Sequence, residues 1–96
     1  MPGYFMGVLH SITDESAFRE YQRVAMPILE QYGGKPVIAS RDIESSDGDW
    51  SPESIVLFEF ESGEHARRWY NSPEYQAVVG LRIESTVSNG VFMDVE

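Results

Sequence analysis

The segment that most constrains the fold is the apolar strand pattern at Ile55–Phe60, with the sequence IVLFEF. Side chains alternate between the two faces of a strand, so Ile55 and Leu57 share one face while Val56 and Phe58 share the other. Because both faces are largely apolar, both need a cover. A chain of 96 residues with two helical regions can cover only one face of its sheet. The pattern therefore predicts a homodimer formed through the open sheet face.

The first third of the chain predicts a strand followed by a helix. Alternating side chains mark a strand over Tyr4–Ile12. Apolar residues at spacings of three and four then mark a helix capped by Thr13 or Asp14. Gly33-Gly34 is a strong stop signal for this helix. We expect Pro27 to kink or break the helix, because proline has no amide hydrogen to donate.

The rest of the chain completes a familiar order of elements. A second strand is expected at Val37–Ile43, before a polar loop and the strand at Ile55–Phe60. A helix capped by Ser62 follows. Another, capped by Ser72, begins with Pro73 and carries Tyr75, Val78, Val79 and Arg82 within one sector. Asn89-Gly90 predicts a turn before a last strand, Val91–Val95. The order is βαββαβ, the ferredoxin-like α+β pattern, which gives a single domain over residues 1–96 with an antiparallel four-stranded sheet and helices on one face.

Composition excludes several kinds of partner and site. The chain has 7 Lys and Arg residues against 16 Asp and Glu, a net charge of −9, which disfavours nucleic acid and anionic membranes. It contains no cysteine, so disulfides, thiolate metal sites and cysteine nucleophiles are excluded. His10 and His65 are too far apart to form a zinc motif. We see neither signal peptide nor membrane span, and we expect a cytoplasmic protein without metal or cofactor.

Four segments resemble a known bacterial family: GGKPVIASR, GDWSP, LFEFES and RRWYNSPEYQAVVGLR. The family is domain of unknown function 1330, and the resemblance covers Tyr4 to Val95. It implies a ferredoxin-like fold in the dimeric α/β-barrel superfamily, where two sheets pack face to face. That superfamily includes cofactor-free monooxygenases, muconolactone isomerases and haem-binding chlorite dismutases.

The resemblance carries no catalytic residue onto this chain, because the family has no established reaction. The chain also departs from the family at two places. Arg41-Asp42-Ile43 stands where members often have Arg-Gly-Gly, and Ser54 stands where they often have arginine. An anion site that depends on that arginine is therefore not implied here.

Polar residues within the apolar pattern define a candidate site. His10 and Glu59 are candidate catalytic residues, because a histidine beside a carboxylate can transfer a proton at neutral pH. Arg41 and Arg82 are candidate ligand-binding residues, because a guanidinium can hold a carboxylate or enolate with two hydrogen bonds. Aromatic side chains would form the walls of the cleft. They are Trp50, Trp69 and Tyr75.

Each of these residues also has a structural interpretation. Arg82 can form a buried ion pair with Glu59, and His10 can be a hydrogen-bonded sheet residue. Trp69 and Tyr75 fit an ordinary core. Two functions therefore stay open. One is a small-molecule-binding protein or enzyme of the dimeric α/β-barrel type, such as a cofactor-independent oxygenase or isomerase acting on a small planar or acidic molecule. The alternative is a non-catalytic dimeric binding or accessory module.

Overall fold

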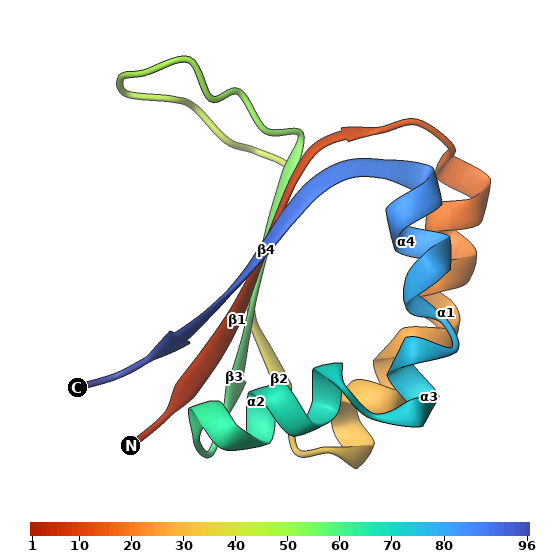
Figure 1. Ribbon diagram of the computed structural model, residues 1–96. Coiled ribbons are helices and arrows are strands. Elements are labelled where there is room, and N and C mark those ends of the chain that lie inside the picture. The colour runs from red at the N-terminus through yellow and green to blue at the C-terminus, as the bar shows by residue number, and fades with distance from the viewer.

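The computed structural model describes residues 1–96 and shows an antiparallel sheet with every helix on the same side of it (Figure 1). The strand order is β2-β3-β1-β4, which is the ferredoxin-like arrangement that the sequence predicts. The sheet is open and does not close into a barrel within one protomer. The elements are β1 Gly3–Ile12, α1 Glu15–Gln31, β2 Lys35–Ser40, β3 Ser54–Phe60, α2 Gly63–Tyr70, α3 Pro73–Gln76, α4 Val79–Ser85 and β4 Thr86–Asp94.

Side-chain caps fix where three of the helices begin, as the sequence predicts. Asp14 accepts a hydrogen bond from the amide of Ala17 at 3.0 Å, which selects it over Thr13 as the cap of α1. Ser62 and Ser72 cap α2 and α3 in the same way. Such caps satisfy amide donors that the first helical turn leaves free, and each contributes about 1 kcal/mol.

Two expectations about the helices are corrected. The expected break at Pro27 does not occur, because α1 continues through Pro27 to Gln31. Pro27 and Arg23 are both exposed, so water can replace the hydrogen bond that the Arg23 carbonyl loses. The helix that begins at Ser72 is also shorter than expected: α3 ends at Gln76, and α4 starts separately at Val79.

The expected turn at Asn89-Gly90 is wrong. These two residues lie inside β4, where Asn89 pairs with Val8 and Gly90 pairs with Gly7. A Cβ atom at position 90 would lie 2.6 Å from the Phe5 ring. Glycine therefore serves the packing of an aromatic ring there, because no side chain fits between the strand and that ring.

The second strand also differs from its expected bounds. It runs from Lys35 to Ser40 as the edge of the sheet, and its pairing with β3 is irregular between Pro36 and Ile38. An edge strand tolerates proline because the missing amide removes no bond from a central ladder.

The sheet register gives each face its own rows of side chains. Toward the helices lie a row of one proline and three phenylalanines, Pro36, Phe58, Phe5 and Phe92, and beside it a row of smaller residues, Ala39, Val56, Gly7 and Gly90. The opposite face carries an apolar row across all four strands: Ile38, Leu57, Met6 and Val91. No helix covers that row, and Ile38 is 50% exposed.

The loop between β2 and β3 extends from the sheet on the side away from the helices (Figure 1). Its Trp50 ring lies 5.1 Å from the ring of His10, edge to face. None of the helices combines the length and the apolar character needed to cross a membrane.

Candidate functional site

The helix-covered side of the sheet contains a cavity with a volume of about 330 Å³. Its floor includes Gly7, Ala39 and Val56 from the row of small residues, and one face of α1 forms its roof. Gly7 contributes no side chain, which leaves space above the middle of β1. Eleven of the seventeen lining residues are hydrophobic, so the cavity suits a molecule with a mainly apolar body.

Arg82 is the only lining residue of the cavity that carries a formal charge. It extends from α4, and its Nη1 donates to the Tyr75 hydroxyl at 3.4 Å. Its Nε is buried and has no hydrogen-bond partner. Arg82 forms no ion pair, whereas the four arginines Arg23, Arg41, Arg67 and Arg68 each pair with a carboxylate. The Arg82–Glu59 ion pair, which the sequence left open as the structural interpretation of these residues, is therefore absent.

Two tyrosines connect Arg82 with α1. The Tyr21 and Tyr75 hydroxyls lie 2.8 Å apart, and Tyr21 lines the cavity. Burial raises the pKa of Tyr75 far above its ordinary value and also raises the pKa of Tyr21. Both phenols consequently keep their protons at neutral pH. Two hydroxyls joined by one hydrogen bond use one hydrogen between them, so the pair has another to donate.

Trp69 is a core residue and a wall of the same cavity. It is 1% exposed, and its ring contacts Phe5, Phe60 and Tyr75, the last with a centroid distance of 4.3 Å. Its Nε1 is buried without a partner. The structure thus brings together three of the predicted site residues, because Trp69 and Arg82 line the cavity and Tyr75 contacts both.

The structure does not bring His10 and Glu59 together. Both lie on the open face, but Glu59 pairs with Tyr4, six residues before His10 along β1. At about 3.3 Å per residue that separation is about 20 Å. The Glu59 carboxylate accepts from the Tyr4 hydroxyl at 2.9 Å, and His10 Nε2 lies 2.8 Å from the Asn89 amide oxygen. Each candidate therefore has a local partner, and neither lines the cavity.

The remaining two candidates also lie outside the cavity. Arg41 follows β2 and pairs with Glu15 at 3.1 Å, which raises the pKa of Arg41 and ties the β2–β3 loop to the start of α1. Trp50 stands beside His10 on the open side of the sheet. The structure therefore separates the candidates into a group at the cavity, a group on the open side of the sheet, and Arg41 beside the start of α1.

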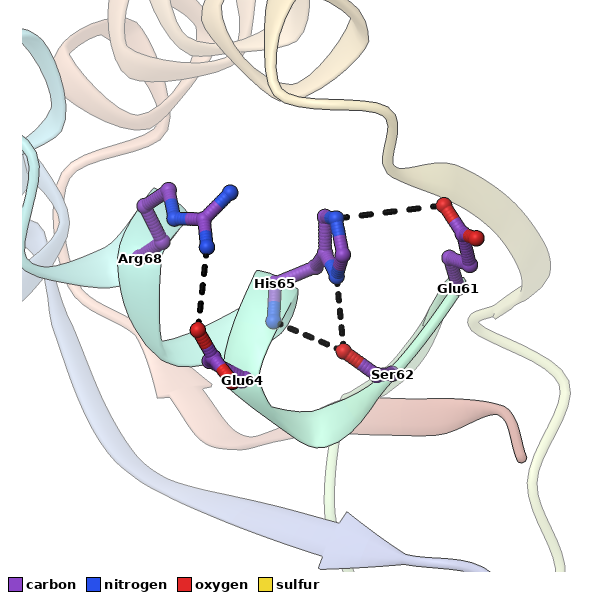
Figure 2. Close-up of polar contacts among 5 residues, drawn as sticks. All are labelled: Glu61, Ser62, Glu64, His65 and Arg68. Carbon is purple, nitrogen blue, oxygen red and sulfur yellow. Dashed lines mark hydrogen bonds and ion pairs between the residues drawn. The ribbon is translucent and has the colours of Figure 1, made fainter.

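A second polar cluster at the start of α2 resembles a hydrolase triad but is built as a helix cap (Figure 2). Ser62 Oγ lies 2.6 Å from His65 Nδ1, and His65 Nε2 lies 3.8 Å from a Glu61 oxygen. Ser62 Oγ also accepts from the His65 amide at 3.2 Å, which is the capping bond. Neither Ser62 nor His65 lines a cavity, so no substrate is placed against this serine.

Sequence reasoning missed Tyr21 and Gln22 as cavity residues. Tyr21 lies on the apolar stripe of α1, so its spacing indicates core and does not reveal its hydroxyl partner. Gln22 neighbours that stripe and has no sequence signal of its own. Nowhere in the structure do three or more His, Cys, Asp or Glu side chains gather in a way that could hold a metal ion.

Sequence comparison identifies one family. The family model described as "Domain of unknown function (DUF1330)" matches residues 2–95. No curated protein matches the sequence.

Several solved structures share the fold at low sequence identity. A protein of unknown function from Rhodopseudomonas palustris has a TM-score of 0.77 and 18% identity, with 99% of this chain and 82% of that chain covered. A dimeric ferredoxin-like protein of unknown function from Jannaschia sp. CCS1 has a TM-score of 0.66 and 18% identity, with 99% and 100% covered. A variant of SnoaB, a cofactor-independent oxygenase from Streptomyces nogalater, has a TM-score of 0.64 and 12% identity, with 99% and 93% covered. These similarities extend to the fold alone.

Proposed function

This chain belongs to the DUF1330 family, a domain family of unknown function, and from that premise we propose that it is a homodimer whose protomers each bind one small molecule. The proposed binding site is the cavity between the sheet and the helices. The observation that carries this proposal is an apolar cavity of about 330 Å³ that contains an arginine without a counter-ion. Cavities of a few hundred Å³ with a few convergent polar groups are typical small-molecule sites.

The open face supports the proposed dimer. It carries the apolar row of Ile38, Leu57, Met6 and Val91, and a contiguous apolar surface of this kind is typical of a protein interface. Lys35 and Glu59 face each other at one end of it, so the two formal charges on these paired strands cancel. A second copy can therefore approach this face despite the charge of −9 on the whole chain.

The cavity chemistry favours binding over a reaction that begins with deprotonation. None of its lining residues is His, Asp, Glu, Lys or Cys, so the cavity offers no side chain that accepts a proton at neutral pH. For this reason we keep the non-catalytic binding module as a second candidate function, beside an oxygenase or isomerase. For His10 and Glu59 we propose a role in the dimer interface rather than in proton transfer, because both lie on the open face.

Native mass spectrometry and a cavity-filling variant test the proposal together. The chain mass is 10.9 kDa, so we expect a native mass of twice that value plus any retained small molecule. Ala25→Phe places a ring into the cavity from α1, while Ala77→Phe adds the same ring at an exposed position. Binding of 2-acetylnaphthalene, followed by ligand-observed NMR, should disappear in the first variant and persist in the second. Equal binding by both variants contradicts the cavity as the site, and a monomer contradicts the dimer.

A further inference from the structure

The two side-chain nitrogens that are buried without a hydrogen-bond partner both belong to residues of the cavity. They are Trp69 Nε1 and Arg82 Nε, and no other buried side-chain nitrogen or oxygen lacks a partner. Both residues contact Tyr75, one through ring packing at 4.3 Å and one through a hydrogen bond at 3.4 Å. An unmade hydrogen bond to a buried group costs about 1–3 kcal/mol, so two donors without acceptors on residues of the same cavity indicate acceptors that come from outside the chain.

The charge of the missing acceptor follows from Arg82. A partly buried guanidinium without a carboxylate is unfavourable even in a protein with an excess of acidic residues. Sixteen acidic side chains are present, yet none pairs with Arg82, whose side chain donates to the Tyr75 hydroxyl and lies over the Phe5 ring. A negatively charged oxygen on the ligand would supply the absent counter-ion.

The protonation state of that oxygen follows from the groups that surround it. The cavity lining has donors but no base, and burial keeps the Tyr21 and Tyr75 phenols protonated. A neutral molecule that must lose a proton inside the cavity would find nothing to accept it. The ligand therefore has to be ionised before it enters. Flat aromatic walls at Phe5, Phe58 and Trp69 favour a planar, conjugated body beside the charge.

We infer that the cavity is selective for a planar, conjugated monoanion, a carboxylate or an acidic enol already ionised in water, whose charged oxygen pairs with Arg82 and whose further acceptor oxygen receives the Trp69 indole N–H. This inference rests on the proposed function, since it names the class of molecule that the same cavity takes. It also makes any reaction at this site one that starts from a preformed anion.

Three probes with the same fused bicyclic carbon skeleton test the inference: 2-naphthoate, a carboxylate; 2-hydroxy-1,4-naphthoquinone, an enol ionised at neutral pH; and 2-acetylnaphthalene, which is neutral. Titration calorimetry on the wild-type protein at pH 7 should show at least one anionic probe binding tenfold or more tightly than the neutral probe. The anion that shows the preference identifies the chemistry as carboxylate or enolate. Equal affinities for all three probes would overturn the inference.

Two substitutions assign the preference to Arg82. Arg82→Met keeps an unbranched apolar stem without the charge, so the ratio of anionic-probe to neutral-probe affinity should fall to threefold or less. Arg82→Lys keeps the charge without the fork of donors, and should retain part of the preference. An undiminished preference in Arg82→Met would contradict the assignment to Arg82. Neutral-probe binding that resists Ala25→Phe contradicts the proposed function instead, so the two failures are distinguishable.

Discussion

The two faces of the sheet lack different kinds of contact. On the helix-covered face the apolar side chains are well packed, but the Trp69 indole and the Arg82 guanidinium have donors without acceptors. On the open face the Tyr4–Glu59 hydrogen bond satisfies its polar groups within the protomer, while the apolar row stays partly exposed, most at Ile38 and Val91. Unpaired donors are satisfied by acceptors and exposed apolar area by another apolar surface. The contrast therefore points to a small ligand with acceptor oxygens for one face and a protein partner for the other.

The largest expected effect separates the two tryptophans. Trp69→Ala removes a ring that is 1% exposed, and we expect a loss of about 3–5 kcal/mol in the free energy of unfolding. Trp50→Ala removes a ring that is 54% exposed and packs edge to face on His10, so its loss should stay below about 1 kcal/mol. Urea unfolding at one fixed protein concentration measures both. Similar losses for the two variants would contradict the distinction between core and open face.

The next effect concerns the open face. Leu57→Asp places a carboxylate in the middle of the apolar row, where a partner subunit would bury it without a counter-ion. Burial of an uncompensated charge costs about 3–5 kcal/mol, so the dimer dissociation constant should rise at least 100-fold. Ile83→Asp makes the same change at an exposed apolar residue of α4, away from the sheet, and should leave dimerisation unchanged. Sedimentation velocity across a concentration series separates these outcomes, and an intact Leu57→Asp dimer would exclude this face as the interface.

Local sequence patterns predict much of the fold because their physical causes are local. Alternation gives the strands, and the caps at Asp14, Ser62 and Ser72 follow from side-chain oxygens that meet amides three residues on. The length of the chain also limits its helices to covering one face of the sheet. These features together are enough for the order βαββαβ and for one uncovered face.

The candidate site is only partly predictable, because it depends on register and on which sheet face a helix covers. His10 and Glu59 share a face, but the β1–β3 register sets them six residues apart, and no pattern within either strand reveals that offset. Arg82 and Glu59 lie on opposite sides of the sheet, which excludes their ion pair. Arg82, Trp69 and Tyr75 meet because three helical segments converge, and this convergence follows from the break after Gln76 that the sequence did not predict.

The smallest expected effect tests the error at Asn89-Gly90. Glycine in a turn is kept for its backbone freedom, whereas Gly90 lies in a strand beneath the Phe5 ring. Gly90→Ala should therefore destabilise the protein by about 1–3 kcal/mol through overpacking, even though alanine suits a strand better than glycine does. Gly80→Ala is the matched control, because a Cβ atom at that position of α4 meets nothing within 4 Å. It should stabilise the protein by about 0.5–1 kcal/mol through the helix preference of alanine. Thermal unfolding of both variants measures the difference. A stabilised Gly90→Ala would show that the Phe5 ring can move aside, and hence that the helix-covered face is packed more loosely than these distances indicate.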